Sequence, residues 1–435
     1  MKQLFFLFLT LSLSYLYSQN RPHIDMNKET QVTIDSIGGK LKTEPSVVID
    51  DDIIIVSWND SYGGQTGTDY GVCVGWAISY DTGATFDFGG YLSKLDNDSY
   101  GGADSWLAKD NEGNFYLQVL SFNKALNLYF MERTNLGHWI RLPDPVTSKT
   151  VDKPFLHIAN DNSLWISYSD NQSIYVISSK NRGKRWSNPI LVSNNNPKSR
   201  GGSSITSYED KILVAWAENE EGNFFDELWY NEISNRTQVE PKLIFKQKGV
   251  QRTQTPGYSM GIDHEGTKGR IITPNLTWIN SINSELHPIS VTFGTKSKDV
   301  NKILLFDFDL KNSSWKKPMD VGDVTYSPVR IFASNSNIKD LPAVLYYDRR
   351  HCSIENCTIT DVYLSILVNS KWVDYKINDE STDWNEVVGD KTYAPIQRNF
   401  GDYITLANDD NKAVAVWTDG RNKTSQIYIR VIKLK

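Results

Sequence analysis

The chain has 435 residues, a formal net charge of −6 and an aromatic content of 12%, with 13 Trp and 22 Tyr. A chain of this length holds two or three domains or one repetitive domain, so internal repeats must be sought first. The acidic balance excludes a typical nucleic-acid-binding protein, and the aromatic-rich composition favours strands over helices.

The first 18 residues have the pattern of a secretory signal peptide. One Lys precedes an apolar run of roughly a dozen residues, which is short for a membrane span, and small and polar residues follow around Ser18. We therefore expect an exported protein, secreted or periplasmic, with no membrane span. Residues 19–42 form an N-terminal segment in this interpretation.

An apolar run that ends in an aromatic residue and then an acid or amide recurs along the chain. The seven copies are IVSWND at Trp58, VLSFN at Phe122, WISYSD at Tyr168, VAWAEN at Trp216, NLTWIN at Trp278, VLYYD at Tyr346 and AVWTD at Trp417. Their spacing of roughly 46 to 71 residues is typical of four-stranded propeller blades. The repeat predicts an all-β fold, a single seven-bladed β-propeller over residues 43–435, with six blades as the alternative.

In each copy we expect the aromatic residue near the end of the second strand, with a short apolar inner strand before it. The last repeat ends after its third strand, at IYIRVIKLK. An open sheet edge needs a partner, and the unassigned segment TQVTIDSI, residues 30–37, is a candidate strand that closes the last blade.

The stretch SYDTGATF, residues 79–86, repeats its spacing in SKNRGKRW, residues 179–186. In the first copy, Asp81 can accept backbone hydrogen bonds and Gly83 can adopt a positive φ. The motif is predicted to form the turn before an outer strand, with a structural rather than a catalytic role.

These turns resemble the Asp boxes of sialidase-like (BNR-repeat) β-propellers, and DKPFLHIA, LYYDRR and FGDYITLAND resemble segments of bacterial secreted members. The resemblance covers roughly residues 43–433. It implies a secreted glycosidase with an arginine triad for a carboxylate, a Tyr nucleophile paired with Glu, and an Asp acid/base. The chain departs from true sialidases because it lacks their Arg-Ile-Pro signature and has seven predicted blades instead of six.

Two alternatives remain open beside a glycoside hydrolase that acts on an acidic, carboxylated or sulfated, glycan. Seven-bladed polysaccharide lyases cleave ulvan and related uronate polymers by β-elimination with His, Tyr and Arg. A propeller can also bind a glycan without cleaving it. In each case the expected partner is an acidic polysaccharide or glycan, and the protein is expected to be a monomer.

The loops that enter the inner strands should meet on one face of a propeller, where ligands usually bind. From these loops we take Arg252, Tyr258 and Arg398 as substrate-binding candidates, and Asp402 and Tyr403 as catalytic candidates. Guanidinium groups suit carboxylates and sulfates, and a Tyr beside an acid can act as a nucleophile.

Loops between second and third strands should reach the same face. They contribute Asp60 as a catalytic acid and Arg350 and Arg421 as substrate-binding candidates. The alternative is a structural role, in which such arginines brace neighbouring blades by ion pairs.

Two sequence features suggest metals. The segment YDRRHCSIENC places Asp348, His351, Cys352 and Cys357 within ten residues, which predicts a Cys352–Cys357 disulfide or, as a sharper hypothesis, a zinc site. The oxygen-rich segment DNDSYGGADS, residues 96–105, is a candidate for structural calcium. No other cofactor is predicted, and Cys73 is expected to be a small buried apolar residue.

Overall fold

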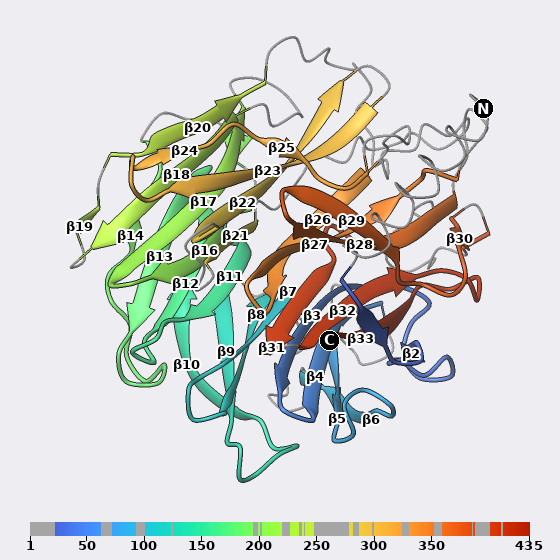
Figure 1. Ribbon diagram of the computed structural model, residues 1–435. Helices are drawn as coiled ribbons and strands as arrows, with labels where there is room; N and C mark the ends of the chain where they lie inside the picture. The colour runs from blue at the N-terminus through green and yellow to red at the C-terminus, as the bar shows by residue number, and fades with distance from the viewer. Residues whose placement is uncertain are drawn as a thin grey trace, which may run out of the picture.

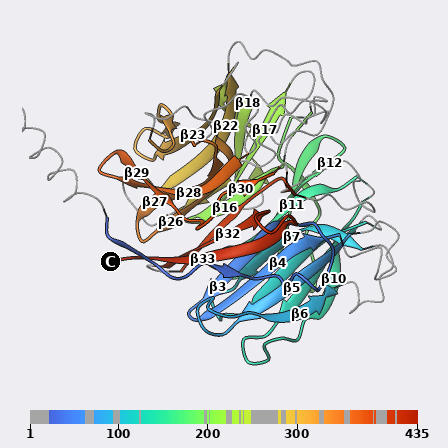
Figure 2. The ribbon, with the colours of Figure 1, turned by 90° about the vertical axis from the view of Figure 1, so that its right-hand side faces the viewer.

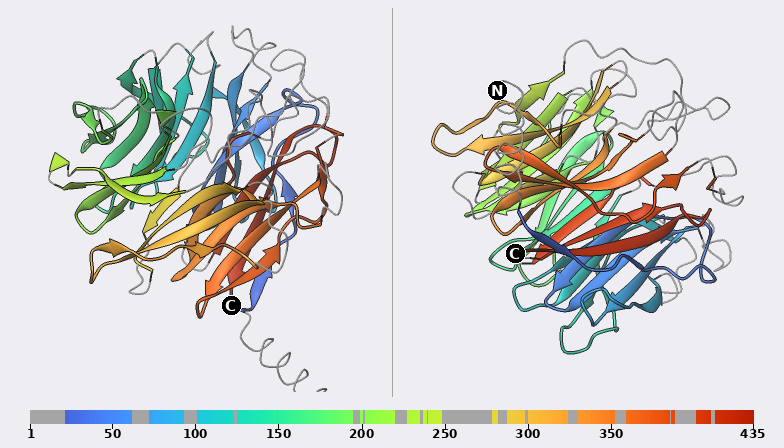
Figure 3. Two further views of the ribbon diagram at one scale, coloured as in Figure 1. Left: turned by 90° about the horizontal axis from the view of Figure 1, so that it is seen from above. Right: turned by 45° about the vertical axis from the view of Figure 1, so that its right-hand side comes forward.

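The structure is a computed structural model that describes residues 22–61, 72–92, 101–122, 125–148, 150–194, 199–200, 202–219, 227–234, 237–238, 240–247, 278–281, 287–297, 300–323, 330–351, 359–384, 386–387, 401–409 and 412–435. These residues form seven antiparallel sheets set side by side around an axis (Figures 1 and 3). The fold is a seven-bladed β-propeller, which confirms the fold predicted from the aromatic repeat.

The strands of the first three blades follow one another in chain order from the axis outward. Blade one consists of β3 (Lys42–Asp50), β4 (Ile53–Asp60), β5 (Cys73–Ser79) and β6 (Asp87–Tyr91). Blade two consists of β7 (Gly102–Lys109), β8 (Phe115–Ser121), β9 (Ala125–Met131) and β10 (Ile140–Thr147). Blade three consists of β11 (Asp152–Ile158), β12 (Leu164–Asp170), β13 (Ser173–Ser179) and β14 (Ile190–Leu191).

Blades four to six keep this order and add short strands at their edges. Blade four contains β15 (Ser199–Arg200), β16 (Ser204–Tyr208), β17 (Lys211–Asn219), β18 (Glu227–Ser234), β19 (Thr237–Gln238) and β20 (Lys242–Lys246). Blade five contains β21 (Trp278–Ser281), β22 (Ile289–Ser297), β23 (Val300–Asp309), β24 (Ser314–Trp315) and β25 (Met319–Asp320). Blade six contains β26 (Arg330–Ile338), β27 (Leu341–Asp348), β28 (Ile359–Val368), β29 (Lys371–Lys376) and β30 (Thr382–Asp383).

Blade seven joins the two ends of the chain. Its strands are β31 (Thr405–Asp409), β32 (Lys412–Asp419) and β33 (Gln426–Leu434), to which β1 (Ile24–Met26) and β2 (Thr30–Gln31) add antiparallel to β33. Figure 2 shows the blue N-terminal segment running beside the red β33. The predicted closure is confirmed, and it begins upstream of residues 30–37 because β1 also pairs with the end of β33.

The inner strands contact one another in a closed ring that runs from β3 through β7, β11, β16, β21, β26 and β31 back to β3. Serine hydroxyls link several neighbours, because each accepts the backbone N–H of the next inner strand. These pairs are Ser46 with Leu107 at 2.9 Å, Ser204 with Ile279 at 2.8 Å, and Ser334 with Leu406 at 2.9 Å. Such bonds satisfy buried backbone donors that no strand ladder reaches.

The aromatic-then-acid repeat has a structural cause. A buried indole N–H needs an acceptor, and an acid two residues further along the same strand supplies it. The pairs are Trp58 with Asp60 at 3.2 Å, Trp216 with Glu218 at 2.7 Å and Trp417 with Asp419 at 3.1 Å, and all three indoles are fully buried. The motif therefore has a structural role in the second strand of the blade.

One strand assignment from the sequence is wrong. Trp278 was expected near the end of a second strand, but it begins β21, the inner strand of blade five. Inner and second strands are both buried, so both carry the same apolar-aromatic pattern. The segment GYSMGID, residues 257–263, which would be the short apolar inner strand before Trp278 in the sequence-based assignment, lies outside the described residues.

The two repeated turns adopt the same geometry between the third and fourth strands. In the first, the Ser79 hydroxyl donates to Asp81 at 2.8 Å and accepts from the Gly83 N–H at 2.9 Å, and Gly83 has a φ of +79°. In the second, Ser179 donates to Asn181 at 3.0 Å and accepts from Gly183 at 2.9 Å. The spacing specifies a turn, as predicted, at the end of the blades where the inner strands finish.

Candidate functional site

The inner strands of three successive blades each have, within their first three residues, one residue in the left-handed region of backbone space. The φ angle is 54° at Glu44, 50° at Asp104 and 45° at Lys153. Each residue lies in a β-bulge, where the register against the second strand shifts. Non-glycine residues are uncommon in this region, and bulges re-aim side chains, often beside functional sites. The entrance face, defined as the end where the inner strands begin, is therefore the place to look for function.

Charged side chains from these strands meet beside the axis. The Lys153 ammonium lies 2.9 Å from Asp402 Oδ2 and 3.4 Å from Asp104 Oδ2. Asp402 belongs to the segment that leads into β31, so the three side chains come from blades two, three and seven. We call Glu44, Asp104, Lys153, Asp402 and Tyr403 the axial cluster.

Glu44 brings blade one into the axial cluster. Its carboxyl oxygens accept hydrogen bonds from Asn59 Nδ2 at 2.8 Å and from the backbone N–H of Asp402 at 3.1 Å, and it also hydrogen-bonds the Asp104 side chain. Asn59 in turn accepts the backbone N–H of Asp104 at 3.0 Å. Gly401 lets the chain pass closely, because a Cβ there would lie 2.4 Å from Glu44 Cγ. The glutamate is fixed from three blades.

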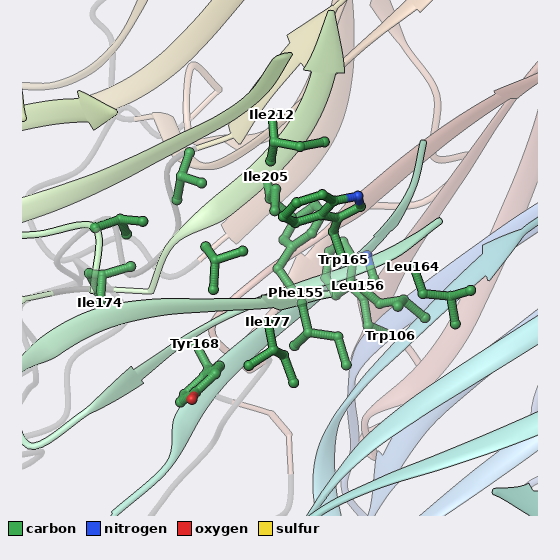
Figure 4. Packing of buried hydrophobic residues seen from close by; sticks show 14 of the residues in the cluster. Trp106, Phe155, Leu156, Leu164, Trp165, Tyr168, Ile174, Ile177, Ile205 and Ile212 are labelled. Carbon is green, nitrogen blue, oxygen red and sulfur yellow. The ribbon is translucent and has the colours of Figure 1, made fainter. Parts of the chain in front are cut away.

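Aromatic rings from four blades pack against one another next to the axial cluster. The ring centroids of Trp106 and Phe155 are 4.0 Å apart, and Trp278 lies 5.1 Å from Trp106. Tyr403 extends the group, with its ring 5.8 Å from that of Trp106. Figure 4 shows Trp106 and Phe155 within the larger apolar cluster of blades two to four. These rings fill the space between the inner strands and hold the charged side chains in place.

Two buried hydroxyl groups at the entrance face have no hydrogen-bond partner among the described residues. They are the Tyr403 phenol, on a residue only 3% exposed, and Ser203 Oγ, on a fully buried residue just before β16. Buried polar groups are almost always paired, and an unpaired one loses its hydration without compensation. The two hydroxyls are suited to hold a water molecule or a ligand hydroxyl.

The environment of Glu44 keeps a proton on the axial cluster. Burial raises the pKa of Glu44 well above its usual value of 4.5; the Lys153 ammonium lowers it in part, and the carboxylates of Asp104 and Asp402 raise it. Burial and the neighbouring negative charges therefore favour the protonated form of Glu44, so this carboxyl group is suited to act as an acid.

Lys153 and Tyr403 keep their protons as well. Burial opposes the charge of Lys153, but Asp104, Asp402, Glu44 and Asp152 together raise its pKa well above 10.5. Burial, followed by the charges of Glu44 and Asp104, raises the pKa of the Tyr403 phenol well above 10. Lys153 is therefore a permanent cation, and Tyr403 is a neutral hydroxyl group that can donate a hydrogen bond.

The catalytic residues predicted from the sequence fall into two places. Asp402 and Tyr403 belong to the axial cluster. Asp60 lies apart at the end of β4, fully buried, where it accepts hydrogen bonds from Trp58 Nε1 at 3.2 Å, Tyr91 Oη at 3.2 Å and the Gly39 N–H at 2.7 Å. These donors tie the N-terminal segment to blade one.

Arg350 and Arg421, the substrate-binding candidates in the described residues, are buried in ion pairs. The Arg350 Nη2 atom lies 2.7 Å from Asp348 and 2.8 Å from Asp374, and the guanidinium covers the Tyr363 ring at 3.8 Å. We call each such arginine, with its two carboxylates, a blade brace.

The second blade brace joins blade seven to the N-terminal segment. Arg421 lies 2.6 Å from Asp419 and 2.6 Å from Glu29, and its guanidinium covers the Tyr428 ring at 4.4 Å. Both arginines are thus ion-paired, as the alternative supposed, but within a single blade rather than between neighbouring blades, and their binding of substrate stays a prediction. Arg252, Tyr258 and Arg398 lie outside the described residues.

Only some of the residues predicted to bind metals lie in the described part of the chain. Asp348 pairs with Arg350 and with Arg330, whose Nε lies 3.2 Å away, and His351 Nε2 lies 2.9 Å from the Tyr363 hydroxyl. No group of three or more potential metal ligands occurs in the part of the chain that the structure describes. Cys352 and Cys357 lie outside it, as do residues 96–100 of the calcium candidate, so these hypotheses stay predictions. Cys73 is a buried residue of β5, and its thiol donates to the Asp60 carbonyl oxygen at 3.7 Å.

Sequence reasoning missed Glu44, Asp104 and Lys153. The available signal was the match between TEPSVVI and DKPFLHI, in which a charged residue and a Pro open an inner strand at Glu44 and Lys153. Asp104 is not followed by a Pro. It shares with Glu44 and Lys153 only the β-bulge, and no residue type in the sequence marks such a bulge. All three residues have a left-handed backbone conformation, a common feature that can be recognised only in the three-dimensional structure.

No protein-family model and no curated protein sequence matches the chain. Among solved structures, an ulvan lyase, a polysaccharide lyase, is 8% identical with a TM-score of 0.53, over 92% of this chain and 95% of that one. A protein of unknown function from Dyadobacter fermentans is 11% identical with a TM-score of 0.50, over 95% of this chain and 100% of that one. The NanB sialidase from Streptococcus pneumoniae is 12% identical with a TM-score of 0.40, over 93% of this chain and 70% of that one.

At such identity the first two likenesses establish a shared propeller fold alone. The sialidase score is too low to support the sialidase-like interpretation, which stays a prediction. The described residues include no helix long and apolar enough to cross a membrane.

Proposed function

We propose that the protein is an exported glycoside hydrolase whose active site is the axial cluster. The observation that carries the proposal is the meeting of the Glu44, Asp104 and Asp402 side chains, which come from three different blades, around Lys153 at one point on the axis. Glycoside hydrolysis requires a protonated carboxyl group beside a carboxylate, and environment sets the two roles. Glu44 fits the first role, because burial raises its pKa. Asp402 fits the second, because Lys153 pairs with it.

In the proposed reaction, Glu44 donates its proton to the glycosidic oxygen as the bond from that oxygen to the anomeric carbon breaks. Asp402 either attacks the anomeric carbon or takes a proton from the water that attacks it. A water molecule completes the product and returns a proton to the site, so the reaction uses only side chains and water. We assign proton donation to Glu44 rather than to Asp60 because Asp60 lies apart from the axial cluster, at the end of β4, where it accepts hydrogen bonds from Trp58, Tyr91 and Gly39.

The remaining members of the axial cluster position the substrate. The unpaired Tyr403 hydroxyl can donate to a sugar hydroxyl, and Lys153 holds Asp104 and Asp402 close together. The pKa of Tyr403 disfavours a phenolate nucleophile. Acidic groups of the glycan, if the predicted specificity holds, are assigned to Arg252 and Arg398.

A polysaccharide lyase is the second candidate, and one observation favours it. A neutral Tyr403 hydroxyl beside a permanent Lys153 cation is the kind of pair that can protonate a leaving group and neutralise a uronate carboxylate. Glycan binding without cleavage is the third candidate. All three place the ligand at the axial cluster.

One assay separates the three candidates. The mature protein is incubated with a panel of sialosides, neutral polysaccharides and uronate-containing polysaccharides while reducing ends and the ultraviolet absorbance of unsaturated uronates are followed together. The hydrolase proposal predicts new reducing ends without an absorbance gain. A parallel rise of both signals would establish the lyase instead, and binding without either signal would leave a glycan-binding propeller.

A further inference from the structure

Asn59 links two members of the axial cluster. It belongs to β4 and is only 8% exposed. Its Nδ2 group donates to Glu44 Oε2 at 2.8 Å, and its Oδ1 atom accepts the backbone N–H of Asp104 at 3.0 Å. Because a backbone N–H can only donate, the bond to Asp104 turns the amide oxygen toward blade two. The Nδ2 group is therefore held toward Glu44 as a hydrogen-bond donor.

The fold itself does not require an amide at this position of the bulge. In blade one, Asn59 pairs with Thr43, the residue before the left-handed Glu44. At the corresponding position, blade two has Leu120 and blade three has Ser169. A bulge thus forms opposite an apolar residue and opposite a hydroxyl residue as well. The amide occurs in the blade whose bulge presents Glu44, which points to a role in the site.

Both oxygens of the Glu44 carboxyl group accept hydrogen bonds from fixed donors. Oε2 accepts from Asn59, and Oε1 accepts from the backbone N–H of Asp402 at 3.1 Å. Hydrogen bonds to an ionised acceptor are roughly twice as strong as those between neutral groups, so both bonds strengthen when Glu44 loses its proton. Burial acts in the opposite direction, because it disfavours the charged form. The two donors therefore stabilise the carboxylate that remains after proton donation.

We infer that Asn59 is a positioning residue for the proposed hydrolysis and stabilises the negative charge that develops on Glu44. In this step the proton moves from Glu44 to the glycosidic oxygen, the electron pair of the broken bond stays on that oxygen, and the Glu44 carboxylate remains. Donors that are already aimed at a developing charge lower the barrier without reorganisation. The inference rests on the proposed function and deepens it, because Asn59 acts through Glu44 rather than on the substrate.

Charged and titratable groups from the other blades also face Glu44. The Lys153 ammonium lowers the pKa of Glu44, and the carboxylates of Asp104 and Asp402 raise it. The Tyr403 phenol, whose own pKa is raised by burial and by the charge of Glu44, is neutral. All these groups stay in place when only the amide is replaced. A change in the titration of Glu44 then follows from the loss of the amide.

The test uses Asn59→Leu and Asn59→Ser, which copy the residues of blades two and three. Without the amide donor Glu44 is a weaker acid, so kcat should fall about 10- to 100-fold, whereas KM should change by less than about threefold. The alkaline limb of kcat/KM should move to higher pH, because the loss of a donor to the carboxylate raises the pKa of Glu44. Reducing-end release is measured on the panel of sialosides, neutral polysaccharides and uronate-containing polysaccharides.

The matched control is Asn231→Leu in β18 of blade four. Asn231 is buried like Asn59, donates through Nδ2 to the Val192 carbonyl oxygen at 2.7 Å and accepts the backbone N–H of Glu232 at 2.8 Å. Its loss should lower the unfolding free energy, measured with urea, and leave the alkaline limb in place. The control thus shows what the loss of a purely structural amide does to the pH profile.

The possible outcomes separate the inference from the proposed function. An active wild-type protein whose alkaline limb stays in place, or moves to lower pH, in the folded Asn59 variants would overturn the inference and leave the hydrolase proposal standing. An equal shift in Asn231→Leu would also overturn the inference alone. A wild-type protein that releases no reducing ends from any member of the panel would overturn the proposed function and the inference with it. Asn59→Ser keeps a hydroxyl near the Asp104 N–H, so the test does not depend on the folding of Asn59→Leu.

Discussion

The axial cluster and the blade braces both combine a buried cation with carboxyl groups and a tyrosine, but we assign them different roles. In the braces each arginine lies within 2.8 Å of two carboxylates and covers a tyrosine ring. In the axial cluster Lys153 pairs with Asp104 and Asp402, and the Tyr403 hydroxyl has no hydrogen-bond partner among the described residues. Buried polar groups whose hydrogen bonds are complete stabilise a fold, whereas a hydroxyl such as that of Tyr403 is suited to bind a ligand.

The backbone draws the same distinction. The braces follow regular second strands, β27 and β32, whereas the axial cluster depends on three left-handed residues in consecutive bulges. Strained backbone of this kind costs of order 1–3 kcal/mol at each position and persists where the surroundings enforce it. The contrast assigns function to the axis and stability to the braces, and the following variants test it.

The largest effect is expected from Glu44→Gln. The amide keeps the shape and the neutral state of the protonated acid but cannot donate the proton, so kcat should fall about 10²- to 10⁴-fold. The melting temperature should change little, because the amide has the size of the carboxyl group and the charge of its protonated form. Initial rates of reducing-end release, with circular dichroism as the check on folding, measure both quantities.

Arg350→Ala should destabilise the protein and spare catalysis. It removes a buried cation from Asp374 and from Asp348, which still pairs with Arg330, and this loss is expected to cost about 3–5 kcal/mol of unfolding free energy. Denaturant unfolding measures the loss, and kcat is compared below the lowered melting temperature. Arg421→Ala serves as the matched second brace. Lost activity with unchanged stability would instead support the sequence-based prediction that these arginines bind substrate.

Asp104→Asn should shift the pH dependence of catalysis. The charge of Asp104 raises the pKa of Glu44, so its removal lowers that pKa. Because a general acid must carry its proton, the alkaline limb of kcat/KM should move to lower pH in the variant. A shift to higher pH, or an unchanged limb, would show that Glu44 does not set it.

The smallest effects are expected in the repeated turns. Ser79→Ala and Ser179→Ala each remove the acceptor of a glycine N–H, which should cost about 1–2 kcal/mol of unfolding free energy. Because the two turns lie in different blades, the double variant should lose the sum of the two costs. Urea unfolding of the single and double variants measures this, and kcat should not change. Loss of activity in either variant would contradict the separation of turns from site.

The fold was largely predictable because its repeat has a physical cause. A buried indole N–H gains from an acceptor, and in the second strands of blades one, four and seven the acid two residues after Trp58, Trp216 and Trp417 supplies it. The same pattern misplaced Trp278, because a buried inner strand is equally apolar. Chain closure was predictable from the missing fourth strand of the last blade.

The site was only partly predictable. Asp402 and Tyr403 could be placed because they open an inner strand. Glu44 and Lys153 were missed because bulges, which sequence patterns do not mark, turn their side chains toward the axis. The choice of Arg350 and Arg421 followed residue type alone, and residue type does not show whether a guanidinium is already paired.

The most direct test of the central claim is the structure of the Glu44→Gln protein with a cleavable oligosaccharide bound. The account predicts a sugar ring at the axial cluster, with its hydroxyls bonded to Asp402 and to the Tyr403 hydroxyl, and both blade braces intact. An oligosaccharide bound elsewhere, with Arg350 or Arg421 released from its carboxylates to hold it, would contradict the account.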